Sequence, residues 1–462
     1  MDNGILRELP NMNALLAHSS FAGLARPHVK RAAQRVLAEL RSGILSGSVP
    51  EIPSLDECAA RILAEIEKTE TANLRGVINA TGIVLHTNLG RAPLGDALYS
   101  AAAQVYRGYS NLEYDLETGQ RGSRYSHIEN LVCELTGAEA AMVVNNNAAA
   151  VFIMLTTLAK GKRVAISRGE LVEIGGSFRI PEIMEQSGAE LMEVGATNKT
   201  RLSDYSRAVA NGAEILLKVH ASNYEIVGFT ESVSVAELSA FGRENGLPVL
   251  YDMGSCFMTD PEPFGFHFGE TARGGIEAGA DIICFSGDKL LGSMQAGIMA
   301  GRREYIVAIK KHPLARALRA DKLTLAALEA TLRICLYPEE AKSRIPVLAM
   351  LFAEPEELER RALSLAGRLR AVCPVWTVGV CSTADETGGG SLPNVQLSGW
   401  AVTIEPAGLS VQELERRLRR GRIPVIIRIN GGVALISLRT LLPGEEEAVT
   451  EAVRSVYEGD GA

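Results

Sequence analysis

Six short apolar runs in the middle of the chain constrain its fold more than any other feature. The runs cover residues 140–144, 164–167, 191–194, 215–219, 248–251 and 281–285. Helical stretches separate them, so the runs recur at intervals of roughly 25 to 35 residues, which is typical of consecutive βα units. The pattern predicts an α/β fold with a mainly parallel sheet. A further apolar segment, 297–300, is expected to return as a late antiparallel strand.

Other patterns lie on either side of this α/β segment. Before it, residues 29–44 and 55–66 carry apolar side chains at helical spacing, which predicts a small helical module. After it, a helical pattern at 411–420 and strand-like runs at 424–429 and 433–437 indicate a smaller α+β domain. We therefore expect three domains, which are a helical N-terminal module at 1–72, the α/β domain at 73–338 and a small α+β C-terminal domain at 339–462.

Composition and charge exclude several classes of protein. Of the 462 residues, 47% are hydrophobic and 22% are charged, which rules out wholesale disorder. The net charge of -8 argues against a protein coated in basic charge, although it is compatible with a local basic patch. The chain begins without the features of a signal peptide, and three consecutive asparagines interrupt its most membrane-like stretch, 140–159. The seven cysteines form no CxxC pair, which is typical of a reducing compartment, so we expect a cytoplasmic protein without a membrane anchor.

The most specific local signal is the end of the last apolar run. The predicted strand at 281–285 is followed by Ser286, Gly287, Asp288 and Lys289. At the mouth of a parallel sheet, burial lowers the pKa of a lysine, and the neutral amine is then a nucleophile able to form a Schiff base. The alternative is a surface lysine that follows a strand end.

A second apolar run ends in an acid. Asp252 follows the run at 247–251, one predicted βα unit before Lys289. A carboxylate there suits the ring nitrogen of a pyridoxal cofactor, because it keeps the ring protonated and therefore a strong electron sink. The alternative role for Asp252 is to cap a helix, since Gly254 and Ser255 follow it.

A third signal follows the predicted strand at 140–144, where amides and small residues replace the apolar side chains. Asn146, Asn147 and Ala148 stand where a helix is expected to begin, so its first backbone N–H groups would form an anion site that a phosphate can approach closely. Ser286 would add a hydroxyl to the same phosphate. The alternative is an asparagine-rich cap without a ligand. The order of phosphate site, acid and lysine is that of the aspartate aminotransferase-like enzymes of fold type I, which use pyridoxal 5′-phosphate (PLP).

Longer motifs make the resemblance specific. They read VINATG at 77–82, TNLGRAPL at 87–94, EYDL at 113–116, GQRGSR at 119–124 and SRGELVEIGG at 167–176, and the segment around Lys289 joins them. Together they resemble the bacterial selenocysteine synthases, the family of L-seryl-tRNA(Sec) selenium transferases. The resemblance spans nearly the whole chain, including the N-terminal module.

The resemblance implies an activity and a cofactor. PLP is then bound to Lys289, seryl-tRNA(Sec) loses water to give an aminoacrylyl intermediate, and selenium from selenophosphate adds to yield selenocysteinyl-tRNA(Sec). From the residues themselves, Lys289 would remove the seryl α-proton while Asp252 holds the ring. The family forms large rings of dimers, so the resemblance also implies a homo-oligomer. No metal site is expected, because no pair of histidines has metal-ligand spacing.

Arginines form another group of candidates. Arg91 follows a glycine in a predicted turn, and Arg316 and Arg319 are spaced to project from one side of a helix. Guanidinium groups suit phosphate-like anions, and the resemblance implies that these three arginines line the pocket for the selenium donor. The alternative for Arg316 and Arg319 is a solvated helix face with ordinary ion pairs.

The N-terminal module carries a basic cluster. Arg26, Lys30, Arg31 and Arg35 lie close together in the first predicted helix. Such a stripe suits an RNA backbone, which is recognised by shape and charge. A solvated helix face is the alternative, but the family uses this domain to bind its tRNA.

Two positions depart from the family pattern. After Lys289 the family reads Leu-Leu-Gly-Gly-Pro-Gln-Ala-Gly, whereas this chain has Ser293 and Met294 in place of a Gly-Pro pair. Before Arg439, Ser437 stands where an aspartate is expected.

Two other functions compete with selenium transfer. One is a PLP-dependent lyase or ammonia-lyase for a small phosphorylated amino sugar or amino acid, but such relatives generally lack a module like residues 1–72. The other is an inactive RNA-binding scaffold on the same fold, against which the presence of both Lys289 and Asp252 argues. Binding of tRNA separates the transferase from the lyase, and a visible cofactor band separates the enzyme from the scaffold.

Overall fold

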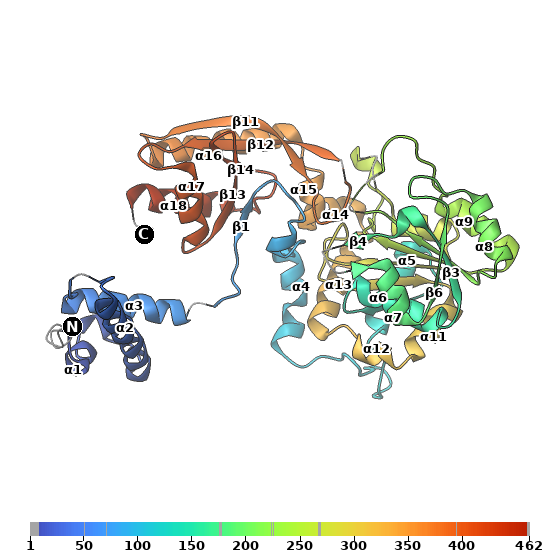
Figure 1. The fold of residues 1–462 in the computed structure, drawn as a ribbon, viewed down its shortest axis with the longest axis horizontal. Coiled ribbons are helices and arrows are strands. Elements are labelled where there is room, and N and C mark those ends of the chain that lie inside the picture. Colours follow the sequence, from blue (N-terminus) through green and yellow to red (C-terminus); the bar gives the residue numbers. More distant parts are fainter. Residues whose placement is uncertain are drawn as a thin grey trace. The chain divides into compact units, whose positions relative to one another are not determined.

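The structure, a computed structural model, describes residues 9–49, 51–70, 72–174, 178–222, 224, 226–266, 269–393 and 395–459. The chain divides into two compact units between Gly76 and Val77, shortly after the predicted end of the helical module. Figure 1 shows both units and labels many of their helices and strands.

The first unit is helical, as predicted. Its helices are α1 (Met12–Leu16), α2 (Arg26–Ser46) and α3 (Leu55–Glu70), with a 3-10 turn at Ser19–Phe21. Val29 and Leu37 of α2 and Ile62 of α3 are buried in one cluster, so the apolar stripes of the two helices face each other. Ser54 and Glu57 exchange backbone-to-side-chain hydrogen bonds and thereby fix the start of α3 where the sequence predicts it.

A seven-stranded sheet forms the centre of the second unit. Its strands, in spatial order, are β2 (Ala140–Val144), β10 (Gly297–Gly301), β9 (Ile282–Ser286), β8 (Val249–Gly254), β7 (Ile215–Val219), β3 (Arg163–Ser167) and β6 (Glu190–Val194). Strand β10 is antiparallel to both of its neighbours, whereas the pairs from β9 to β6 are parallel. The predicted mainly parallel sheet with a late antiparallel strand is confirmed.

Helices cover both faces of this sheet (Figure 1). The helices of this part of the chain are α4 (Gly95–Arg107), α5 (Ser126–Thr136), α6 (Asn147–Leu158), α7 (Ile180–Ser187), α8 (Leu202–Ala210), α9 (Val235–Asn245), α10 (Ala272–Glu277), α11 (Arg303–Lys311), α12 (Leu314–Ala317), α13 (Lys322–Cys335), α14 (Pro338–Arg344) and α15 (Pro346–Leu351). A small hairpin, β4 (Glu173–Ile174) with β5 (Phe178–Arg179), lies between α6 and α7 in the sequence. Successive residues of β2 alternate between two apolar clusters, with Val143 in one and Met142 and Val144 in the other. Both faces are therefore buried, which is why the strands read as continuous apolar runs.

A five-stranded sheet forms the C-terminal part of the same unit. Its order is β1 (Ile78–Ala80), β13 (Val425–Asn430), β14 (Val433–Ser437), β12 (Gln396–Glu405) and β11 (Thr377–Glu386), and its helices are α16 (Pro355–Val372), α17 (Val411–Arg420) and α18 (Glu445–Glu458). The predicted helix and both predicted strands are present, with β13 displaced by one residue. Strand β1 pairs in parallel with β13, so a segment that the sequence assigned to the α/β domain belongs to this sheet.

Within the described residues, no helix is both long enough and apolar enough to cross a membrane.

Candidate active site

The candidate cofactor residues gather at one edge of the seven-stranded sheet. Strands β2 and β9 are both antiparallel to β10 and hence parallel to each other, and β8 pairs in parallel with β9. Their carboxyl ends therefore meet at the same edge, where Asp252, Ser286 and the start of α6 lie. Two of these elements touch directly, because the Asn147 side chain donates a hydrogen bond of 2.8 Å to Asp252.

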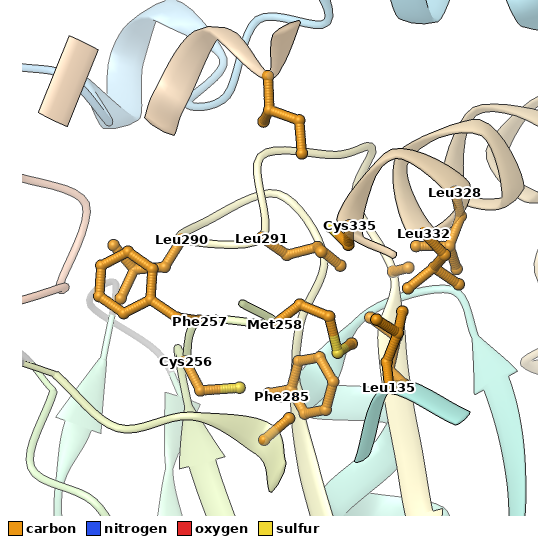
Figure 2. Packing of buried hydrophobic residues seen from close by; sticks show 14 of the residues in the cluster. Leu135, Cys256, Phe257, Met258, Phe285, Leu290, Leu291, Leu328, Leu332 and Cys335 are labelled. Carbon is orange, nitrogen blue, oxygen red and sulfur yellow. The ribbon is translucent and has the colours of Figure 1, made fainter. Parts of the chain in front are cut away.

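Lys289 is buried, with 4% of its surface exposed. Burial lowers the pKa of its amine, and the positive charge of Arg91 lowers the pKa further, while Asp252 and Asp288 act in the opposite direction. The residues that follow hold the loop in place, since Leu290 and Leu291 belong to the buried apolar cluster that Figure 2 shows around the end of β9. The result is a rigidly held lysine with a larger neutral fraction than an exposed lysine has, which is what a nucleophile or base needs.

Asp252 is 2% exposed, and three groups donate to the same oxygen, Oδ1. They are Nδ2 of Asn147 at 2.8 Å, the backbone N–H of Gly254 at 3.0 Å and the thiol of Cys284 at 3.7 Å. Burial raises the pKa of this carboxyl group, and the bonds from Asn147 and Gly254 oppose that rise. Oδ2 takes part in none of these three bonds, so the carboxylate presents one oxygen to a partner such as a protonated ring nitrogen.

The start of α6 has the geometry of an anion site. Asn146 is the N-cap, and its side chain accepts a hydrogen bond from the N–H of Ala149, so the N–H groups of Asn147 and Ala148 precede the first capped donor. Gly297 of β10 packs against this turn so closely that a Cβ would overlap the Asn146 carbonyl oxygen. The turn is thus held against the sheet, with helix N–H groups available at its tip.

Arg91 reaches the lysine loop from an earlier part of the chain. Its Nη1 pairs with Oδ2 of Asp288 at 2.8 Å, and both side chains are largely enclosed, at 29% and 10% exposed. The backbone of Arg91 is left-handed, with φ of 62°, a conformation that non-glycine residues seldom adopt and that often marks functional sites. Sequence reasoning overlooked Asp288, although it precedes Lys289 directly, because an acid at a strand end reads as a turn residue.

The other two predicted anion-binding arginines are placed differently. Helix α12 ends at Ala317, so the expectation that Arg316 and Arg319 share one helix face is wrong. Arg319 instead forms an antiparallel bridge with Val144 at the end of β2, beside the start of α6. Arg316 is exposed on α12, and among the described residues it pairs with none of the other candidates.

Glu113 connects this region to a motif for which the sequence suggested no role. Its carboxylate pairs with Arg124, with Arg121 at 3.0 Å and with Arg319 at 3.7 Å. Arg124 also donates to the carbonyl oxygen of Ala320 at 2.7 Å. The segment that carries Arg319 is therefore held on the motif at 113–124.

Comparison with known proteins identifies the family. Residues 77–442 match the family described as L-seryl-tRNA selenium transferase. The chain is 50% identical over 459 residues to the L-seryl-tRNA(Sec) selenium transferase of Moorella thermoacetica, covering 98% of this chain and 97% of that one. It is 47% identical over 459 residues to the protein of the same name from Geobacter sulfurreducens, covering 98% and 99%. The chain belongs to the L-seryl-tRNA selenium transferase family.

A solved structure supports the fold of this family member. The structure of D-glucosaminate-6-phosphate ammonia-lyase superposes with a TM-score of 0.56 at 20% identity, covering 85% of this chain and 98% of that chain. The predicted α/β fold of type I is confirmed. At this level of identity the likeness concerns the fold alone.

The departures from the transferase family pattern have local explanations. Ser293 is fully buried, accepts a hydrogen bond of 2.9 Å from Thr331 of α13, and thereby ties the lysine loop to that helix. At the second position, Ser437 donates to Asp385 of β11 at 3.3 Å, and Asp385 also pairs with Arg439 at 3.2 Å. Asp385 therefore places a carboxylate beside both Ser437 and Arg439.

The helical unit of this family member displays its basic residues on one helix. Arg26, Lys30, Arg31 and Arg35 are all exposed on α2. Arg35 is partly engaged within the unit, because it pairs with Glu65 of α3 at 3.0 Å. None of the four belongs to the buried stripe of α2, which includes Val29 and Leu37.

Proposed function

We propose that this chain is a PLP-dependent enzyme that converts L-seryl-tRNA(Sec) to L-selenocysteinyl-tRNA(Sec) with selenophosphate as selenium donor. The observation that carries the proposal is identity of about 50% over nearly the full length of named transferases. A cytoplasmic homo-oligomer, expected from the family resemblance, stays a prediction.

The residues at the sheet edge fit PLP. Lys289 offers a buried amine with a lowered pKa, Asp252 offers one carboxylate oxygen for a ring nitrogen, and the N–H groups that begin α6 offer a phosphate site beside Ser286. PLP, when bound, supplies an electron sink for negative charge at the seryl α-carbon. Asn146, Asn147 and Ala148 stay candidates for binding the PLP phosphate, through the backbone groups at the start of α6.

The chain's own groups would divide the chemistry between them. Lys289 would take the seryl α-proton on Nζ, because its amine is neutral more often than that of a free lysine. Asp252 would hold the ring nitrogen protonated. Arg91 and Arg319 would bind the selenium donor, with Arg316 as the third candidate, since guanidinium groups pair well with phosphate-type oxygens.

The helical unit would bind the RNA. Arg26, Lys30, Arg31 and Arg35 give α2 a positive surface, and neutralisation of tRNA phosphates by such groups releases counterions. The small-molecule lyase is the weaker candidate. Its support is a fold likeness at 20% identity, whereas the transferases share about half of all residues with this chain.

A direct assay tests the proposal. The purified chain, saturated with PLP, is incubated with tRNA(Sec) carrying radiolabelled serine, with and without selenophosphate, and the hydrolysed amino acid is identified by chromatography. We expect selenocysteine only with the donor, none with Lys289→Ala, and normal turnover with Lys162→Ala, which removes an exposed lysine. Deamination of D-glucosaminate 6-phosphate without any reaction of seryl-tRNA would instead establish the lyase.

A further inference from the structure

Asn147 connects two elements that the sequence analysis treated separately. It is the first residue of α6, and its Nδ2 donates 2.8 Å to Oδ1 of Asp252 on β8. Its neighbours do something else. Asn146 caps the helix through Ala149, and the exposed Asn145 bonds through its backbone N–H to the Leu318 carbonyl.

The orientation of the Asn147 amide is determined by this contact. Rotation by 180° would put its carbonyl oxygen against the carboxylate oxygen of Asp252, where neither can donate. With Nδ2 toward Asp252, Oδ1 of Asn147 is buried and has no hydrogen-bond partner among the described residues. A buried acceptor without a partner lowers the stability of the fold. In this structure that loss accompanies the hydrogen bond that Nδ2 of Asn147 donates to Asp252.

The contact also determines which face of Asp252 is available. Asn147, Gly254 and Cys284 all donate to Oδ1. Three donors on one oxygen fix the rotation of the carboxylate and leave Oδ2 to face a ligand. Loss of the shortest side-chain bond would let the group rotate and would leave a buried charge less well solvated.

We propose that Asn147 is a positioning residue for Asp252, which orients that carboxylate toward the cofactor ring, and that its side chain is not a phosphate ligand. The inference rests on the proposed function, because it concerns how this chain receives PLP. The turn at the start of α6 then has two separate roles. The Asn147 side chain orients Asp252, whereas the backbone N–H groups and the helix cap made by Asn146 recognise the phosphate. Cys284 acts on the same oxygen through a longer and weaker bond.

Two ligands that differ only in the phosphate distinguish these roles. Dissociation constants for PLP and for phosphate-free pyridoxal are measured by absorbance titration on the full chain and on Asn147→Ala, Asn146→Ala and Asn145→Ala. For Asn147→Ala we expect both ligands to bind about tenfold more weakly, as loss of one hydrogen bond to a charged group implies. For Asn146→Ala, PLP binding should weaken about fivefold, the effect of a lost helix cap, with pyridoxal changed less. Asn145→Ala is the matched control and should change neither ligand.

A cycle with Asp252 tests whether Asn147 acts through that residue. In an Asp252→Asn background, Asn147→Ala should have no further effect on pyridoxal binding, because the carboxylate to be oriented is absent. Cys284→Ala provides a second variant of the same network, and it should weaken both ligands equally and by less than Asn147→Ala. Circular dichroism of each variant reports whether it is folded.

The outcomes are separable. Loss of PLP affinity without loss of pyridoxal affinity in Asn147→Ala would make its side chain a phosphate ligand and overturn the inference. Full additivity with Asp252→Asn would also overturn it. If the unaltered chain binds neither ligand, the proposed function fails, and that result is visible before any variant is measured. If Asn147→Ala does not fold, the same titrations and the same cycle with Asp252→Asn are carried out on Asn147→Ser, whose side chain is polar but too short to replace the amide donor.

Discussion

The sheet edge around Lys289 and the basic surface of α2 both depend on charge, but they use it in opposite ways. At the sheet edge, Lys289, Asp252 and Asp288 are nearly buried, and each acts on the pKa of another. On α2, the basic side chains are exposed to solvent. In the first region the removal of one group leaves another charge buried without its partner, whereas in the second region water and salt compensate most of the loss.

The sharpest test of the first region is Asp252→Asn. We expect turnover of seryl-tRNA(Sec) to fall by about 100-fold or more, because an amide cannot keep the cofactor ring protonated. Affinity for tRNA, measured by gel shift, should stay unchanged. Near-normal turnover would mean that another residue holds the ring nitrogen.

The second region is tested by changing Arg26, Lys30, Arg31 and Arg35 together to alanine. We expect tRNA affinity to fall about 30-fold at low salt, and the slope of log affinity against log salt to flatten by about three, with Arg35 contributing least. PLP binding should not change.

A matched variant removes the same charge elsewhere. It combines Arg333→Ala, Arg360→Ala, Arg416→Ala and Arg419→Ala, each of which pairs with a glutamate on its own helix. An equal loss of tRNA affinity in this control would show that net charge matters and that the location on α2 does not.

For Arg319 and Arg316, the candidate ligands of the selenium donor, we expect effects of intermediate size. Arg319→Ala should raise the KM for selenophosphate about tenfold, the cost of one charge-assisted contact, with little change in tRNA affinity. Arg316→Ala should have a smaller effect, because Glu113 pairs with Arg319 and, among the described residues, not with Arg316. The reverse order would make Arg316 the principal donor ligand and would contradict the placement of Arg319 beside α6.

The two charges that flank Lys289 should shift its titration in opposite directions. The neutral amine adds to an aldehyde, so the rate of PLP binding rises with pH through the Lys289 pKa. Arg91 lowers that pKa and Asp288 raises it. Arg91→Met should therefore move the midpoint of the rate profile to higher pH, and Asp288→Asn should move it to lower pH. Stopped-flow absorbance measures both profiles, and shifts of the same sign would contradict this electrostatic assignment.

Features of the fold and the site could be predicted from the sequence where they depend on residues close together in the chain, and not where they depend on residues far apart. The strands were predictable because apolar runs reflect burial on both faces, and the order of the acid and the lysine follows from parallel strands. The contact between Asn147 and Asp252 was not, because it depends on which strands become neighbours. The amide run was therefore interpreted only as a phosphate site.

Arg319 shows the same limit more directly. Its spacing from Arg316 predicts a shared helix face, but the Leu318 carbonyl accepts a hydrogen bond from Asn145 at 2.8 Å, and the helix ends there. A tertiary bond overrides the local pattern. Likewise, β1 joins β13, a partner that lies far along the chain and that no local pattern indicates.

The smallest expected effect concerns Ser293, where this chain departs from its family. The hydroxyl of Ser293 accepts a hydrogen bond from Thr331 of α13, and the backbone N–H of Ser293 donates to the Gly287 carbonyl at 2.9 Å. Ser293 therefore joins the end of the loop after Lys289 both to α13 and to the start of that loop. Ser293→Ala removes the first of these hydrogen bonds but leaves the Thr331 hydroxyl bonded to the Ala327 carbonyl, so the loss should be about 1 kcal/mol. Amide hydrogen exchange should report local opening about fivefold faster for residues 290–293, with exchange in α2 unchanged. Thr331→Val should accelerate exchange at least as much, because it removes the same bond together with the one to the Ala327 carbonyl. The double variant should add nothing to Thr331→Val, because the bond that Ser293→Ala removes is already absent. Additive effects would mean that the two hydroxyls stabilise the loop independently.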